Sequence, residues 1–207
     1  MNIKILVICD DIYHHEEVIK EGLAFLQKEY ELTYSYDMTD EQLSEYNVVI
    51  LAKDDIVSQS NKEKWLTEDI ERQFEDYATN GGGIIFLHAG AVICMHSAIL
   101  KNISGCAFDN HPEQCIVDFN IISPHPVTDG ATDFDEKDEH YFIDFTATDA
   151  EIFMESRSQY GVQPAGYSRI HGSGRVCVLT PGHNLNVFQN GQYQKMIRNA
   201  VHWCAKN

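Results

Sequence analysis

The stretch Gly81-Gly82-Gly83-Ile84-Ile85-Phe86-Leu87-His88-Ala89-Gly90 decides the fold of this chain. Its four consecutive apolar residues are typical of a short strand that is buried on both faces of a parallel sheet. The glycines before this strand favour the end of a helix, because glycine takes the left-handed conformation of a helix C-cap at little steric cost. The small residues after the strand favour a sharp turn with an exposed His88, as in a nucleophile elbow.

The region before this stretch contains the same kinds of element in alternation. Apolar runs predict three further strands, at residues 3–9, 32–36 and 48–51. Helical spacing of apolar residues predicts two helices and a short helical turn, at residues 14–30, 61–78 and 39–42. Strands that alternate with helices favour an α/β domain built on a parallel sheet.

Beyond residue 105 the pattern changes to strands separated by turns. These strands are predicted at residues 114–122, 139–145, 151–157, 162–170 and 175–179. A closing helix is predicted at residues 189–205, and the segment 102–113 is expected to be irregular. Because the sequence shows no linker, internal repeat or low-complexity segment, we expect a single domain over residues 1–207.

The amino-acid composition excludes several classes of binding partner. The chain has 207 residues, 43% of them apolar, which excludes a disordered protein. Its 32 acidic and 15 basic residues give a net charge of −17, which repels phosphate backbones and anionic lipids. The six cysteines follow no disulfide or zinc spacing, and no signal peptide or membrane span is apparent. We therefore expect a cytoplasmic protein that binds neither nucleic acid nor membranes.

Chemically active side chains follow the predicted parallel strands. Ligands bind open parallel sheets at the carboxyl ends of their strands, so these side chains are expected to converge on one rim. They are Asp10, Asp11, Tyr13, His14 and His15 after the first strand, Lys53, Asp54 and Asp55 after the third, and His88 after the fourth. The glycine triplet is not a phosphate-binding loop, because it precedes its strand and lacks the Lys-Ser/Thr ending.

Several short motifs together resemble the ThuA-like family, which is named for trehalose utilisation. They are the stretch 81–89, Asn110-His111-Pro112, His125-Pro126-Val127-Thr128-Asp129-Gly130, Asp138-Glu139-His140-Tyr141, Pro164-Ala165-Gly166-Tyr167-Ser168-Arg169, Gly174-Arg175-Val176 and Thr180-Pro181-Gly182-His183. The resemblance implies a three-layer α/β/α fold of flavodoxin-like or class I glutamine amidotransferase-like type, with a mostly parallel central sheet. It also implies histidine at the elbow where amidotransferases carry the cysteine nucleophile, so glutaminase activity is not expected.

We assign candidate roles to seven residues. His88, Glu139 and His183 are the candidate catalytic residues: the two imidazoles hold or polarise sugar oxygens, and Glu139 acts as general acid or base. Burial of Glu139 among aromatic residues is expected to raise its pKa. The remaining four, which line the substrate pocket, are Asp11, Tyr13, His14 and His111. His125 is assigned to a rigid turn before Pro126.

The resemblance implies a small-molecule carbohydrate as ligand, either a trehalose-type disaccharide or a keto-sugar derivative. An enzyme of hydrolase or isomerase type is the first hypothesis. A non-catalytic sugar-sensing or assembly module of the same fold is the alternative, and a metal-dependent hydrolase is the third. A divalent metal such as zinc could be bound at this rim by Glu139 or Asp11 together with the histidines His14, His88, His111 and His183. No spacing motif fixes two ligands on one element, so the presence of a metal stays open. A homo-oligomeric state is possible and also stays open.

Overall fold

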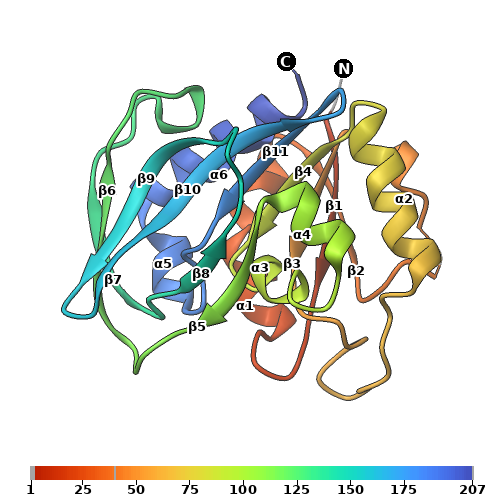
Figure 1. Ribbon diagram of the computed structural model, residues 1–207, viewed down its shortest axis with the longest axis horizontal. Helices are drawn as coiled ribbons and strands as arrows, with labels where there is room; N and C mark the ends of the chain where they lie inside the picture. Colours follow the sequence, from red (N-terminus) through yellow and green to blue (C-terminus); the bar gives the residue numbers. More distant parts are fainter. Residues whose placement is uncertain (1–2, 40, 207) are drawn as a thin grey trace.

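A twisted sheet with helices on both faces forms the centre of the computed structural model, which describes residues 3–39 and 41–206 (Figure 1). Within these residues the sheet has nine strands in the order β2-β1-β3-β4-β11-β10-β9-β6-β7. The strands are β1 (Lys4–Cys9), β2 (Glu31–Ser35), β3 (Val48–Ala52), β4 (Gly83–Leu87), β6 (Cys115–Ile121), β7 (Phe134–Asp138), β9 (Glu151–Ser158), β10 (Gly161–His171) and β11 (Gly174–Leu179). A separate antiparallel pair is formed by β5 (Cys106–Asn110) and β8 (Phe142–Phe145).

Most strands of the large sheet point the same way. β2, β1, β3, β4 and β11 pair in parallel. Antiparallel pairing then extends this block through β10, β9, β6 and β7. Because the direction alternates from strand to strand here, β9 and β7 again run in the direction of the parallel block. The carboxyl end of β7 therefore lies on the same edge of the sheet as those of β1, β3, β4 and β11. The predicted mostly parallel sheet is confirmed.

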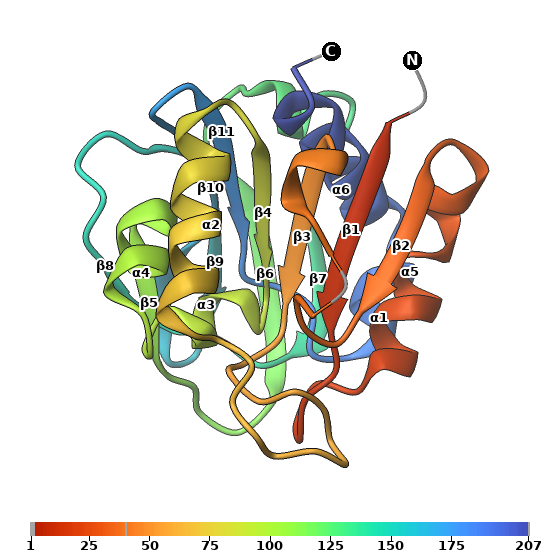
Figure 2. The same cartoon turned by 90° about the vertical axis from the view of Figure 1, so that its right-hand side faces the viewer.

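Two helical layers cover the sheet and confirm the three-layer fold (Figure 2). Alternate residues of β1 point to opposite layers: Ile5 and Val7 join one apolar cluster, and Leu6 and Ile8 join the other. The first layer consists of α1 (Glu16–Gly22), α5 (Leu185–Gln189) and α6 (Gly191–Cys204), and the second of α2 (Glu68–Thr79), α3 (Gly90–Ile93) and α4 (Ala98–Ser104).

The N-terminal helices are shorter than predicted. The helix expected at 14–30 begins at Glu16 and stops at Gly22, and a 3₁₀ helix follows at Ala24–Lys28. The helix expected at 61–78 begins only after Thr67, whose hydroxyl accepts a hydrogen bond from the Ile70 N–H. Residues 56–64 instead form a loop closed by a bridge between Ile56 and Lys64. The turn expected at 39–42 includes residue 40, outside the described residues, and a 3₁₀ turn occurs at Leu43–Glu45.

The C-terminal half contains two strands that were not predicted, β5 and β7. The strand expected at 139–145 is wrong in its first part, because β7 ends at Asp138 and β8 begins only at Phe142. Glu139 thus lies in the connection between two strands. The expected turn at His125 is confirmed: its side chain accepts a hydrogen bond from the Val127 N–H and caps the 3₁₀ helix Pro126–Thr128.

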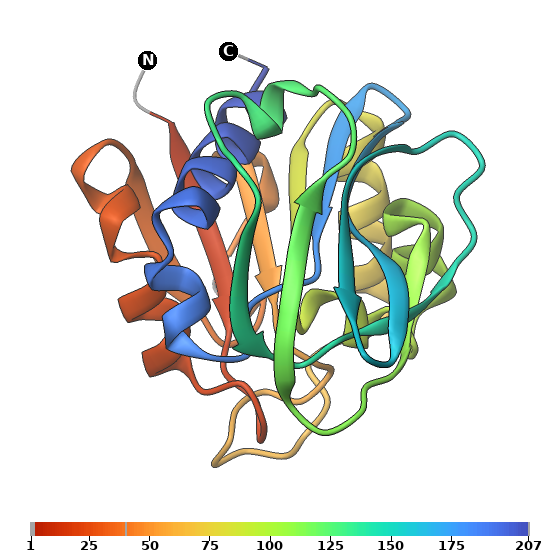
Figure 3. The same cartoon turned by 90° about the vertical axis from the view of Figure 1, so that its left-hand side faces the viewer.

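Where β6 and β7 lie beside α5 and α6, the sheet curls around the first helical layer (Figure 3). Asn186 of α5 donates a hydrogen bond to the carboxylate of Glu136 in β7. None of the described helices is long and apolar enough to cross a membrane.

Candidate functional site

His88 occupies a strained turn directly after β4. Its φ of 45° lies in the left-handed region, and its N–H donates to the carbonyl oxygen of Leu179 at 2.8 Å. Two residues later, a Cβ on Gly90 would lie 2.1 Å from the carbonyl oxygen of Leu51, so glycine is required there. The predicted elbow is confirmed, but its residue is buried instead of exposed: the Tyr141 ring stacks on His88 with centroids 4.1 Å apart.

The protonation of the His88 ring follows from its hydrogen bond. Nδ1 lies 2.7 Å from the carbonyl oxygen of Thr180, which can only accept a hydrogen bond. Nδ1 therefore carries the hydrogen. Burial lowers the pKa of His88, so the ring is neutral and its Nε2 presents a lone pair. That atom faces Oε2 of Glu139 at 3.5 Å.

His14 is oriented in the same manner by a carboxylate. Its Nδ1 lies 3.0 Å from both carboxylate oxygens of Asp11, which also accept hydrogen bonds from the N–H groups of Tyr13 and Asp54. Burial opposes ionisation of Asp11, but these contacts outweigh it and lower the pKa of Asp11 to about 2. Asp11 is therefore ionised, Nδ1 of His14 donates to it, and Nε2 of His14 is left to face the site.

Glu139 joins these rings to His183. Oε2 of Glu139 lies 3.2 Å from Nδ1 of His183, and Oε1 lies 3.5 Å from Nε2 of His111. The approach of this carboxylate raises the pKa of His183. Burial acts to raise the pKa of Glu139, but the facing rings of His183 and His88 hold it below its usual range. The expected rise in the pKa of Glu139 is therefore wrong, because imidazoles as well as aromatic rings surround it.

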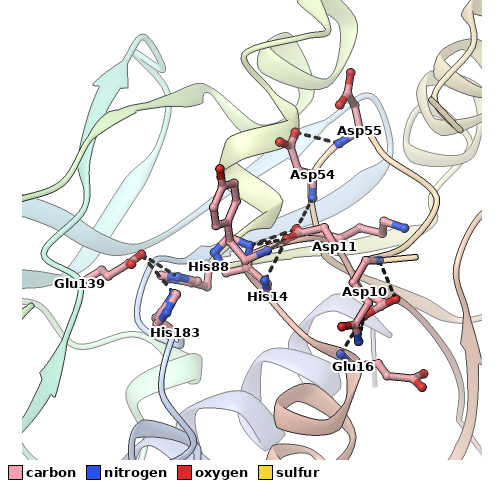
Figure 4. A network of polar contacts seen from close by, with 12 residues as sticks. Asp10, Asp11, His14, Glu16, Asp54, Asp55, His88, Glu139 and His183 are labelled. Carbon is pink, nitrogen blue, oxygen red and sulfur yellow. Dashed lines mark hydrogen bonds and ion pairs between the residues drawn. The ribbon is translucent and has the colours of Figure 1, made fainter. Parts of the chain in front are cut away.

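Together these contacts gather three imidazoles and one carboxylate at the carboxyl edge of the sheet (Figure 4). One side-chain atom from each of His14, His88, Glu139 and His183 lies within 4.8 Å of the others. We call these four residues the His/Glu cluster. They come from the ends of β1, β4, β7 and β11, which meet because these four strands point the same way.

A cavity of about 230 Å³ opens beside the cluster. His14, Glu139 and His183 form part of its wall, with Tyr13, Phe108 and Tyr141 as aromatic neighbours. Among the described residues, no lysine or arginine lines this cavity. Tyr13 is 72% exposed at its mouth, whereas Asp11 is buried behind His14 and supports that ring. Six of the seven candidate residues thus border the cavity or the cluster, and Asp11 lies one layer behind.

The cavity is also bordered by a carboxylate without an assigned role, Asp54. Its oxygen Oδ1 lies 3.2 Å from Nε2 of His96, and burial raises its pKa. The sequence placed Asp54 on the predicted rim after the third strand. Nothing in the residue pattern separated it from Asp55, which instead pairs with Lys64 at 2.6 Å.

Solved structures show how widely this fold occurs. A ThuA-like protein from Parabacteroides merdae is 19% identical, with a TM-score of 0.79 over 99% of this chain and 90% of that one. A GMP synthase subunit from Thermoplasma acidophilum is 14% identical, with a TM-score of 0.63 over 100% and 96% of the two chains. The β-galactosidase from Rahnella sp. R3 is 12% identical, and the match (TM-score 0.71) covers all of this chain but only 32% of that one.

These similarities show the fold alone, since every identity is low. No curated protein matches the chain. The sequence profile described as trehalose utilisation, ThuA, matches residues 4–204 and so includes all four strand ends that carry the His/Glu cluster. This protein is therefore a member of the ThuA family, with the fold of the class I glutamine amidotransferases.

Proposed function

We propose that this protein binds and transforms a carbohydrate, either a trehalose-type disaccharide or a keto-sugar derivative, in the cavity beside the His/Glu cluster. The observation that carries the proposal is the placement of three cluster residues, His14, Glu139 and His183, in the wall of a small, partly aromatic cavity. Such cavities, with a few convergent polar groups, are the usual sites of small-molecule chemistry. The sugar class is taken from the trehalose-utilisation family.

The cavity limits the size and charge of the ligand. Its volume of about 230 Å³ is below the ~300–1,000 Å³ of sites for drug-sized ligands. One sugar ring therefore enters, and the second ring of a disaccharide stays at the mouth beside Tyr13. The cavity is lined by the carboxylates of Asp54 and Glu139, and no lysine or arginine is among the described lining residues. This charge distribution favours a neutral sugar over a phosphorylated one.

The positions of the charged groups divide the chemistry between two parts of the cavity. Glu139 is ionised and faces imidazoles, so it is poorly suited to release a proton. Asp54 has a raised pKa and borders the same cavity from the end of β3. Both properties suit it to proton transfer. His183, whose pKa is raised, then donates a hydrogen bond to the carbonyl oxygen of a keto-sugar while Asp54 takes a proton from the neighbouring carbon. Return of that proton to the former carbonyl carbon completes an isomerisation, provided that the hydroxyl proton of the neighbouring carbon passes to the former carbonyl oxygen.

Acyl transfer by a cysteine finds no support in the arrangement. Position 88 is histidine, and the thiol of Cys94 is buried in α3's C-terminal turn with a pKa well above its usual value. All six cysteines are unpaired thiols, which supports the proposed cytoplasmic location.

Sugar binding and proton exchange test the proposal together. Trehalose and 3-keto-trehalose are offered in D₂O, with binding followed by saturation-transfer NMR and exchange by loss of the proton signal beside the carbonyl. Wild type is expected to bind and exchange. Tyr13→Ala is expected to bind more weakly, and Tyr160→Ala, which removes a tyrosine 44% exposed at the turn between β9 and β10, serves as control. Absence of both binding and exchange in wild type would refute the proposal.

A non-catalytic sugar-sensing or assembly module is the second candidate. The observation in its favour is that the fold also matches about a third of a β-galactosidase chain, where it is one part of a larger protein. Binding without exchange in the same experiment would favour this candidate over an enzyme.

A further inference from the structure

We infer that the His/Glu cluster is a metal centre: His14, His88, His183 and Glu139 together bind one divalent transition-metal ion of the zinc class. The argument uses the orientation of the rings, the unpaired atoms at the centre, the spacing of the donor atoms and the chemistry of the donor set. It stands on this geometry and does not depend on the carbohydrate proposal.

The rings of His14 and His88 are held in the orientation that metal-binding histidines need. A metal-binding histidine usually donates its other ring N–H to a carboxylate or a backbone carbonyl, which fixes the tautomer. His14 donates Nδ1–H to Asp11, and His88 donates Nδ1–H to the carbonyl of Thr180. In both rings Nε2 is thereby the nitrogen directed to the cluster, where Nε2 of His14 also lies 3.4 Å from the hydroxyl of Tyr141.

The centre of the cluster contains unpaired polar atoms. Nε2 of His88 and Nδ1 of His183 are both inaccessible to solvent, and neither makes a hydrogen bond of acceptable geometry within the described residues. Both atoms face Oε2 of Glu139, at 3.5 and 3.2 Å. Buried polar atoms without hydrogen bonds are unfavourable, and a cation between these two nitrogens and the carboxylate oxygen would relieve this cost. A metal ion at this point would satisfy all three atoms.

The donor spacing suits an ion of this size. Ligand atoms ~2.0–2.1 Å from a tetrahedral zinc lie ~3.3 Å from each other. The two contacts of Glu139 Oε2, at 3.2 and 3.5 Å, are already close to this value. The widest separation among the four donor atoms is no more than 4.8 Å, so modest side-chain rotation would bring all four donors into range.

The donor set also selects the class of metal. Three imidazole nitrogens and one carboxylate oxygen suit zinc, iron, cobalt, nickel or manganese, whereas calcium and magnesium prefer all-oxygen sites. The cavity wall formed by His14, Glu139 and His183 leaves one side of the centre open to a small molecule. When bound, such an ion would act as a Lewis acid toward an oxygen that joins the four protein donors as a fifth ligand.

A neighbouring group of donors is a weaker candidate for the same ion. Asp54, Asp55 and His96 also lie close together, but Nζ of Lys64 is 2.6 Å from the carboxylate of Asp55. The lysine already neutralises that carboxylate. His96 therefore provides a variant that separates the two locations.

The experiment measures metal content and affinity, with no substrate. Protein purified without an affinity tag is analysed by elemental mass spectrometry, then stripped with a chelator and titrated with Zn²⁺ and Co²⁺. We expect one ion per chain in wild type, and visible Co²⁺ absorption bands that indicate nitrogen ligation. Glu139→Gln and His88→Ala are expected to lose the ion, and Asp11→Asn to bind it 10–100-fold more weakly. His171→Ala, which removes an imidazole paired with Glu75 outside the cluster, is expected to bind normally.

Circular dichroism and thermal melting of each stripped variant show that it is folded, so loss of metal is not loss of structure. No ion in wild type after titration would overturn the inference. Stoichiometric metal in both Glu139→Gln and His88→Ala would overturn it too, as would loss of the ion in His96→Ala with retention in Glu139→Gln. Metal binding without any sugar exchange would refute the proposed enzyme alone, and sugar exchange by a wild-type protein that takes up no metal on titration would refute the metal centre alone.

Discussion

The carboxylate of Asp138 accepts hydrogen bonds from the backbone N–H groups of Gly182, at 2.8 Å, and His183, at 3.0 Å. Asp138 ends β7 and is fully buried, while Gly182 has a φ of 136° in the loop after β11. β7 and β11 are separated by three strands in the sheet order, so this contact requires the sheet to curl. Asp138 thus fixes His183 relative to Glu139, its own neighbour in sequence.

Substitution of Asp138 should lower both the stability of the protein and its affinity for metal. Asp138→Ala leaves the buried N–H of Gly182 and the half-buried N–H of His183 without acceptors, so we expect a loss of about 3 kcal/mol in the free energy of unfolding. Asp138→Asn keeps one acceptor oxygen and should lose less. Urea denaturation measures the stability, and zinc titration should show weaker binding in both variants. Asp135→Asn, an exposed carboxylate on the same strand, is the control, and equal losses in it would contradict the assignment.

Asp54 should be needed for proton transfer but not for metal binding. Asp54→Asn removes the acid–base group while it keeps the size of the side chain, so we expect exchange of the keto-sugar proton to fall 10²–10⁴-fold. The metal content should stay at one ion per chain, because the His/Glu cluster is intact. Exchange is followed by NMR in D₂O with the exposed Asp118→Asn as control. An Asp54→Asn protein that exchanges at the wild-type rate would exclude this role.

Lys53 should make stability depend on alkaline pH. Its Nζ is buried and donates to the carbonyl oxygens of Tyr36 and Val57, and burial lowers its pKa from 10.5 to about 8. Between these two values the unfolded chain binds the proton more tightly, so folding becomes more favourable as pH rises. We expect wild type to gain about 3 kcal/mol relative to Lys53→Met between pH 8 and 10.5. Urea denaturation of both proteins across this range measures the difference, and a constant difference would exclude the pKa shift.

The turn at His88 should tolerate no Cβ at position 90. Gly90→Ala places a methyl group 2.1 Å from the carbonyl oxygen of Leu51, and both backbone segments must move apart. We expect a loss of about 1–3 kcal/mol in the free energy of unfolding and weaker metal binding. In the matched variant Gly191→Ala the new methyl group meets no atom within 4 Å, at the start of α6. Thermal melting that shows equal stability for the two variants would contradict this explanation.

The parallel strands of the core could be predicted from the sequence because they are buried on both faces. Near-continuous apolar runs distinguish β1, β3 and β4 from their surroundings. β7 has the sequence Phe-Asp-Glu-Lys-Asp and lies at the edge of the sheet, where an exposed face permits charged residues. Its pattern resembles that of a loop, so it was missed. Gly22, where the first predicted helix ends, packs so closely against Phe188 that a Cβ would clash, a contact that periodicity does not reveal.

The candidate site was predictable in its members but not in its electrostatics. The rule that ligands bind at the carboxyl ends of parallel strands predicted that His14 and His88 lie at one edge of the sheet, where their rings are in contact. It could not show that Asp11 turns to support His14, because that depends on a side-chain orientation. The pKa of Glu139 was predicted in the wrong direction for a related reason. Its shift is decided by rings that reach it from the ends of other strands.

The position of β11 has a consequence for the synthesis of this protein. β11 is the last strand in the chain, yet it lies between β4 and β10 in the interior of the sheet. Until residue 179 has left the ribosome, the apolar strand β4 has one unpaired edge, and such edges promote aggregation of nascent chains. We therefore expect truncations before β11 to be insoluble and the complete chain to depend on chaperones while it is made.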